Sequence, residues 1–285
     1  MVGVLHFLIP ESRMGVVTYR DLGATEEYVT RSIPLGSNYY RSVNFMQSVG
    51  AGGGGDTPEA IFEALKEAVD QNWQKGAKRV IVLIGDAPAH ARTRAKIKRL
   101  LRRFTRNGRS FVHAIMTSPH SGRDVEIETQ ECFGEIAKLG RGSCIFLDAE
   151  DKILKHVISL SIGKEYSENI DEVYQIAESR REQVSPKALD LVRRLDFSRI
   201  ERELRKKTVA DDLIKALSRK RDRDLAIFLI GILRRGKFPS TGREAAAYAL
   251  KRILDLDVPP IDSDTGRAIN RRTEVWLRRR VDQSF

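Results

Sequence analysis

The chain has 285 residues, of which 41% are hydrophobic and 31% are charged, and its formal net charge is +11. This length accommodates two modest globular domains, and the positive charge favours an anionic partner such as nucleic acid, an anionic lipid surface or an acidic protein. The longest apolar runs, such as Val80–Ile84 and Ala226–Leu233, are far shorter than the roughly 20 residues of a membrane-spanning helix, so no membrane span is expected. Cys132 and Cys144 are too few for a disulfide scaffold or a cysteine-based zinc site.

Short segments of mixed type make up the first part of the chain. Apolar residues at helical spacing in Met1–Ile9 indicate the last turns of a helix. Met14–Tyr19 and Glu27–Ile33 are β-rich, and Asn44–Val49 leads into the glycine tract Gly52–Gly55. These patterns predict two strands followed by a glycine loop.

Two helices flank a buried strand in the next part. Thr57–Gln74 has apolar residues at helical spacing, and Pro58 suits the start of a helix because its fixed φ and missing N–H cost nothing there. Val80–Ile84 is nearly all branched and aliphatic, which is typical of a parallel strand covered on both faces. Arg92–Arg109 has no acidic residue and carries Ile97, Leu100, Leu101 and Phe104 on one helical face, so it predicts an amphipathic helix with a basic outer face.

Strands and helices continue to alternate as far as residue 163. The expected elements are the strands Ser110–Thr117 and Ser143–Leu147 and the helices Glu128–Leu139 and Asp151–Ile162. Such alternation predicts an α/β domain with a Rossmann-like, doubly wound and mostly parallel sheet between Met14 and Leu147.

The strand signals stop after about Lys164, which places a domain boundary between residues 1–163 and an all-α domain of residues 164–285. The helical pattern extends from Tyr166 to Phe285. Arg243–Leu254, an acidic loop and Asn270–Arg280 resemble the final helices of HEAT-like repeats, and the alternative is a plain helical hairpin extension.

Several motifs of the first domain occur in the order found in von Willebrand factor A (VWA) domains. RMGVVTYRD at Arg13–Asp21 resembles the second strand, FMQSVGAGGGGDTPE at Phe45–Glu59 the loop before the long helix, and VIVLIGDAPAH at Val80–His90 the fourth strand. Ser110–Ser118 and Ser143–Ala149 match the fifth and sixth strands. The residues of these motifs are most similar to those of alpha-kinase-associated and hemicentin-type VWA domains, whose fold serves recognition rather than catalysis.

The resemblance implies a metal-ion-dependent adhesion site for Mg²⁺ or Mn²⁺, which prefer oxygen ligands. By position, Thr57 and Asp86 are the matching ligands, with Asp56 as the substitute if the loop shifts by one. The family's main ligands come from a D-x-S-x-S loop on the first strand, and this chain has no D-x-S-x-S. His90 is a poor ligand for a hard cation. We therefore expect no cofactor in this chain, and Mg²⁺ or Mn²⁺ only if an upstream D-x-S-x-S strand exists.

The absent first strand also affects the expected sheet, because in VWA domains this strand lies in the middle. Without it, Met14–Tyr19 either pairs directly with Val80–Ile84 or both inner edges stay unpaired, which invites aggregation. We expect that the chain begins downstream of its natural start; the alternative is a degenerate domain.

These features favour a non-enzymatic protein-interaction module. No Ser/His/Asp or Cys/His order and no P-loop is found, and His113 lies within an apolar strand as a core residue would. The carboxyl ends of parallel strands gather ligands, so this rim is expected to bind an acidic group on another protein. The binding residues that this predicts are Arg20, Asp21, Gly54, Gly55, His90 and His120. The alternative is binding of nucleic acid or anionic surfaces through Arg92–Arg109 and the basic C-terminal domain.

Overall fold

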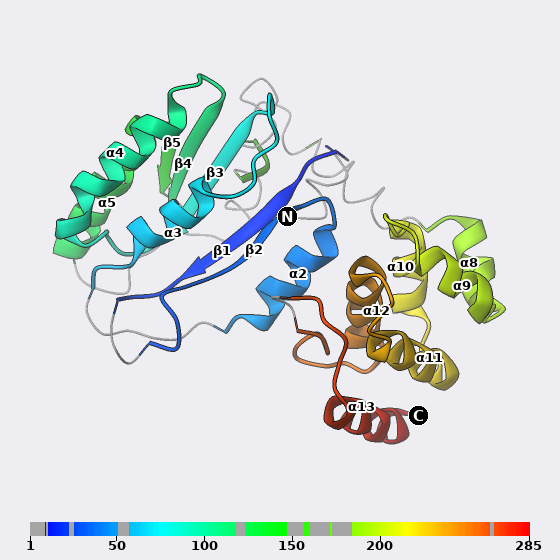
Figure 1. Ribbon diagram of the computed structural model, residues 1–285. Coiled ribbons are helices and arrows are strands. Elements are labelled where there is room, and N and C mark those ends of the chain that lie inside the picture. The colour runs from blue at the N-terminus through cyan, green and yellow to red at the C-terminus, as the bar shows by residue number, and fades with distance from the viewer. Residues whose placement is uncertain are drawn as a thin grey trace.

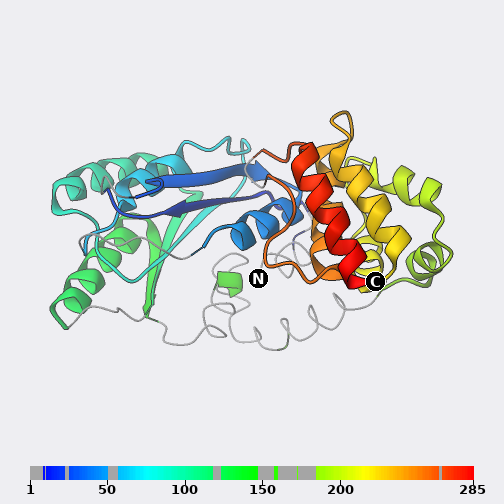
Figure 2. The same ribbon diagram turned by 90° about the horizontal axis from the view of Figure 1, so that it is seen from below.

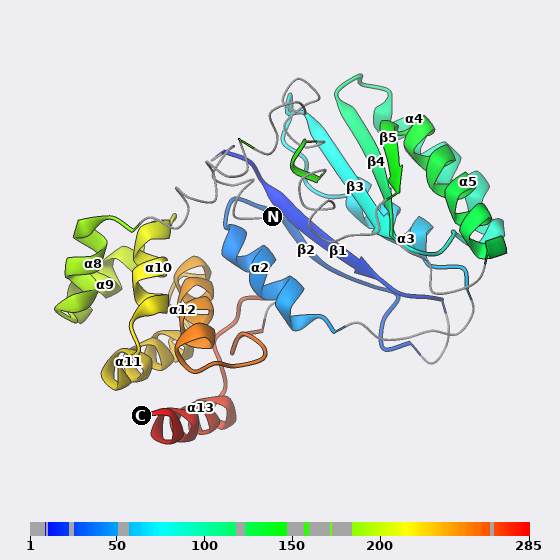
Figure 3. The same cartoon turned by 180° about the vertical axis from the view of Figure 1, so that it is seen from behind.

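The computed structural model describes residues 9, 11–22, 26–50, 57–117, 123–146, 157–159, 172, 184–262 and 265–285. Views from opposite sides show the strands in one half of the molecule and the helices of residues 184–285 in the other (Figures 1 and 3). The view from below shows the same separation (Figure 2). The fold is mixed α/β with a three-stranded parallel sheet and many helices.

The first two strands form an antiparallel pair. β1 (Met14–Tyr19) pairs with β2 (Thr30–Gly36), and the register shifts between Met14 and Val16. β1 has the expected bounds, whereas β2 begins three residues later than the predicted Glu27–Ile33. Arg20 and Val29 extend the pairing by one backbone hydrogen bond of 3.0 Å.

The three later strands form a separate parallel sheet in the order β3-β4-β5. They are β3 (Arg79–Gly85), β4 (Ser110–Met116) and β5 (Arg141–Phe146), each within a few residues of its prediction. Their side chains alternate between faces, and one face packs into a core together with the flanking helices. The core residues of β3 and β4 are Ile81, Leu83, Val112, Ala114 and Met116.

The expectation of one doubly wound sheet is only partly right. Within the described residues β1 pairs with β2 alone and β3 pairs with β4 alone, so the β1–β2 pair and the parallel sheet are separate. The physical reason is the one anticipated from the sequence, because nothing in the described chain supplies a strand between β1 and β3. Of the two expected arrangements, the described residues show the second, in which the inner edges of β1 and β3 have no strand partner.

Three main helices pack on the core face of the parallel sheet. They are α3 (Ile61–Val69), α4 (Arg94–Thr105) and α5 (Arg123–Leu139), with a 3₁₀ turn η1 (Ala91–Thr93) before α4. α4 lies within the predicted basic helix. α3 is shorter than the predicted Thr57–Gln74, because Glu59 before it pairs with Pro88 and Ala89, which follow β3. The predicted helices at 1–9 and 151–162 lie almost wholly outside the described residues.

Helix α2 (Tyr39–Ser48) was not expected from the sequence, which assigned Asn44–Val49 only as a lead into the glycine tract. Asn38 caps it by accepting a hydrogen bond from the backbone N–H of Tyr40. The helix contacts α12 of the last part of the chain, and the Asn44 amide donates to the Glu244 carbonyl oxygen at 3.0 Å. Tertiary packing therefore stabilises a helix whose sequence is a weak helix former.

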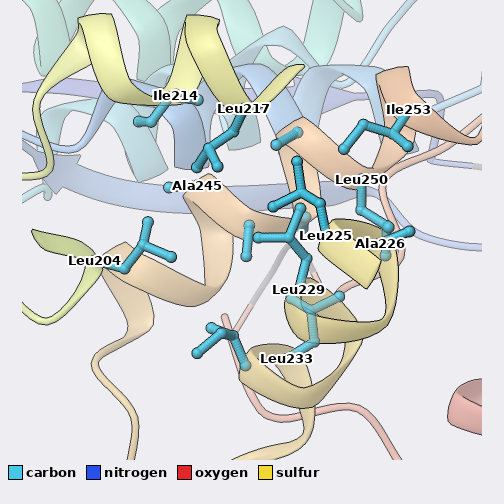
Figure 4. Close-up of a cluster of buried hydrophobic side chains, with 14 of the residues drawn as sticks. Leu204, Ile214, Leu217, Leu225, Ala226, Leu229, Leu233, Ala245, Leu250 and Ile253 are labelled. Atoms are coloured by element: carbon cyan, nitrogen blue, oxygen red, sulfur yellow. The ribbon is translucent and has the colours of Figure 1, made fainter. Parts of the chain in front are cut away.

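Residues 184–262 and 265–285 contain helices alone as regular elements. In chain order these are α8 (Pro186–Arg193), α9 (Phe197–Leu204), α10 (Asp211–Arg219), α11 (Arg223–Arg234), α12 (Ser240–Ile253) and α13 (Arg271–Ser284). Leucine, isoleucine and alanine side chains of α9 to α12 meet in one core (Figure 4). Tyr40 of α2 belongs to the same core. In the described chain no helix is both long and apolar enough to cross a membrane.

Candidate functional site

The ends of β1 and β3 meet at one rim of the molecule. Asp21 follows β1 and His90 follows β3, and the His90 Nε2 atom lies 2.9 Å from the Asp21 Oδ1 atom. Asp21 is only 3% exposed. Because both residues follow the carboxyl ends of their strands, the contact shows that β1 and β3 end at the same side.

The segment before α3 bridges the two sheets at this rim. The Ala60 N–H donates to the Arg20 carbonyl oxygen at 3.1 Å, and the Glu59 N–H donates to the Pro88 carbonyl oxygen at 2.8 Å. Glu59 also forms a parallel β-bridge with Ala89. Backbone hydrogen bonds from two neighbouring residues therefore tie the end of β1 to the end of β3.

Tyr19, the last residue of β1, makes a second link between the sheets. Its hydroxyl donates to the carbonyl oxygen of Ile84 in β3 at 2.9 Å. Burial raises the Tyr19 pKa above its ordinary value, and electrostatic interactions with Glu59, Asp86 and Cys132 raise it further. The phenol therefore stays protonated and serves as a permanent donor across the rim.

Glu59 is the most perturbed acid of the rim. Its pKa is raised to about 7, mainly by burial and in addition by the charges of Asp21, Asp86 and Glu26, while His90 lowers it. One carboxyl oxygen of Glu59, Oε2, is buried and has no hydrogen-bond partner. Several acidic side chains therefore lie close enough to Glu59 to disfavour its ionised form.

Arg20 is engaged within the chain. Its guanidinium lies 3.6 Å from Glu26 and 3.9 Å from Glu27 and stacks over the Tyr28 ring at 4.5 Å from the centroid. Its charge is therefore paired within the chain and the ring covers one face of the guanidinium, and the predicted role of Arg20 in binding a partner stays a prediction.

The structure brings together some of the predicted site residues. Asp21 and His90 are in contact, Arg20 is adjacent, and Asp86 is near enough to raise the pKa values of Glu59 and Tyr19. Thr57 is described in the turn before α3. Asp56, Gly54, Gly55 and His120 lie outside the described residues. Glu59 was not predicted as a site residue, although it belongs to the motif at residues 45–59. In the helix predicted from Thr57, an acidic residue at position 59 would lie in the first turn, where acids are common for structural reasons.

No group of three or more His, Cys, Asp or Glu side chains that could hold a metal ion is found within the described part of the chain. The side chains that the structure describes at the rim do not form the octahedral oxygen site that Mg²⁺ requires. His90 is oriented towards Asp21, and Arg20 neutralises neighbouring carboxylates.

We therefore expect isothermal titration calorimetry to detect weak binding of Mg²⁺ or Mn²⁺ or none, because Thr57 and Asp86 alone cannot hold a labile hard cation. A micromolar or tighter dissociation constant that is abolished by Asp86→Ala would contradict this expectation. It would mean that other residues complete the site.

His113 illustrates a structural histidine elsewhere in the sheet. It is 7% exposed in β4, and its Nδ1 atom accepts a hydrogen bond of 3.0 Å from the Ser143 N–H of β5. Its imidazole therefore serves strand pairing, as the apolar sequence around it suggested.

Comparisons with known proteins give little further information. No family model matches the chain, and no curated protein matches it. Among solved structures, the chain is similar to the crystal structure of the conserved hypothetical protein BatB from Bacteroides thetaiotaomicron, with 17% sequence identity and a TM-score of 0.41. The match covers 61% of this chain and 84% of that chain. A similarity of this extent supports no assignment of function.

Proposed function

We propose that this protein is a non-enzymatic protein-binding module in which a VWA-like domain with an incomplete metal site presents the rim at the ends of β1 and β3. The observation that carries the proposal is the gathering of Asp21, Glu26, Glu59 and Asp86 at this rim, where burial first and these neighbouring acids second raise the Glu59 pKa to about 7. The VWA-like arrangement is supported by the β1–β2 pair and the β3-β4-β5 sheet, and by α3, which lies between β2 and β3 in the chain. The helical part, HEAT-like by sequence, would act as a spacer or a second docking face.

The charges of the rim favour a basic group on the partner and not the acidic group expected from the sequence. Asp21, Glu59 and Asp86 interact electrostatically, and Arg20 is already paired with Glu26. A lysine or arginine of a partner would place a positive charge beside this group of carboxylates. Such a contact would lower the Glu59 pKa, because an opposite charge favours the ionised form.

The proposal predicts which peptides bind and how pH affects them. Selection from a random peptide library should enrich basic peptides, and their affinity should rise between about pH 6 and pH 8. The sign follows from the pKa of about 7, since Glu59 is mostly neutral below it and mostly ionised above it. Fluorescence anisotropy of a labelled selected peptide measures the affinity at each pH.

The test variant is Glu59→Gln/Asp86→Asn, which removes charge while keeping size and shape. It should weaken the selected peptide at least tenfold and abolish the pH dependence. The matched control is Asp124→Asn/Glu131→Gln, which removes the same charge from α5, where Glu131 is exposed. Equal weakening by both variants, or enrichment of acidic peptides, would overturn the proposal.

A further inference from the structure

Helix α4 presents a row of arginines that the rim does not use. The outer face of α4, defined here as Arg99, Arg102, Arg103 and Arg106, is exposed to solvent. These positions follow the i, i+3, i+4, i+7 spacing of one helical face. The opposite face is buried in the core through Ile97, Leu100, Leu101 and Phe104.

The cations on the sides of α4 are paired, whereas those on its outer face are not. Arg94 forms an ion pair with Glu128 of α5, and Lys98 lies 3.7 Å from Glu135. In the described chain no ion pair joins the outer-face arginines to an acidic residue. Like charges at i, i+4 destabilise a helix by a few tenths of a kcal/mol per pair, so a polyanion bound there would relieve repulsion.

The geometry favours a nucleic-acid backbone over other polyanions. At 1.5 Å per residue the outer face spans about 10 Å, which corresponds to about three phosphates of one DNA strand. Guanidinium groups match phosphate oxygens in a bidentate way. The apolar side chains of α4 are already buried, so the helix has none left to insert into a lipid surface.

We propose that the outer face of α4 binds the phosphate backbone of nucleic acid without reading its sequence. Stacking on bases is not expected, because residues 92–109 expose no aromatic side chain. This surface is separate from the rim and does not depend on the function proposed for the rim.

The test is fluorescence anisotropy of the full chain with labelled duplex DNA of two unrelated sequences, titrated with salt. Both sequences should bind alike. With about three phosphates neutralised, the logarithm of the affinity should fall with the logarithm of salt concentration with a slope of about −3. Arg99→Glu/Arg102→Glu/Arg103→Glu should weaken binding at least tenfold and bring the slope close to zero.

Two further variants separate local binding from net charge and from loss of fold. Arg271→Glu/Arg272→Glu/Arg279→Glu changes the net charge equally, but on exposed residues of α13, and should leave most of the binding. Arg99→Lys/Arg102→Lys/Arg103→Lys keeps the charge and should retain the salt dependence. Circular dichroism checks that each variant is folded.

Equal loss in the α13 variant, or no DNA binding at low salt, would overturn the assignment to α4. Tighter binding to polyglutamate or to phosphatidylserine–phosphatidylcholine vesicles than to DNA would overturn the choice of nucleic acid. Loss in the lysine variant equal to that in the glutamate variant would also contradict a phosphate contact that depends on charge.

Discussion

Gly242→Ala is expected to lower the free energy of unfolding of the helical part by about 1–3 kcal/mol, the range for overpacked sites. Gly242 lies in the first turn of α12, where it passes close to the end of α9. A Cβ atom at this position would lie 2.1 Å from the Leu204 carbonyl oxygen and 2.6 Å from the Phe238 Cε1 atom. The backbone oxygen cannot move alone, so α9 and α12 would have to separate.

Gly231→Ala is the matched control for this prediction. Gly231 lies inside α11, and a Cβ atom there would meet nothing within 4 Å. Alanine is favoured over glycine in a helix interior by about 1 kcal/mol, so this variant should be more stable than the wild type. Urea denaturation followed by the helical circular dichroism signal measures both. Unchanged or increased stability of Gly242→Ala would show that α9 and α12 tolerate a wider spacing.

The parallel sheet and its helices could be predicted from the sequence because their signals are local. The apolar run at 80–84 is long enough to mark β3, and the spacing of Ile97, Leu100, Leu101 and Phe104 marks the buried face of α4. The predicted boundaries of helices were less accurate where a backbone N–H group forms a hydrogen bond with a residue outside the helix. Thus Glu59 donates its N–H to Pro88, and α3 begins later than the pattern from Thr57 indicated.

Helix α2 and the Glu59 carboxyl environment could not be predicted from local pattern. α2 is held by Asn44 and Glu244, which are 200 residues apart in the chain, and no spacing rule links such positions. The raised pKa of Glu59 depends on burial by tertiary packing and, in addition, on acids that follow β1 and β3. The sequence did place Asp21 and His90 at one rim, since the carboxyl ends of parallel strands lie together, and the Asp21–His90 contact agrees with that placement.

Glu244 gives the second large effect, because it is a buried acid where α2 meets α12. Its exposed fraction is 2%, the Asn38 amide donates to its carboxylate, and the Arg41 guanidinium lies 3.9 Å away. Burial raises the Glu244 pKa to about 7, although Arg41, Arg243 and the Asn38 hydrogen bond each lower it. The ionised form is therefore less favourable in the folded protein than in the unfolded chain.

This shift predicts that the wild type loses stability as pH rises. Below the ordinary pKa of 4.5 both states hold the proton; between 4.5 and about 7 only the folded state holds it. Stability from Glu244 is therefore complete below pH 4.5 and is lost as pH rises through 7, by about 3 kcal/mol for a shift of this size. Urea denaturation at a series of pH values measures the loss.

Glu244→Gln should flatten this pH dependence, because the amide keeps the shape and has no proton to lose. Glu59 has a pKa raised in the same direction, so some decline should remain in Glu244→Gln and should shrink further when Glu59→Gln is added. Asp255→Asn, a change at an exposed acid just beyond α12, is the control and should leave the wild-type profile. A Glu244→Gln profile as steep as that of the wild type would show that Glu244 is already ionised at low pH through its pairing with Arg41.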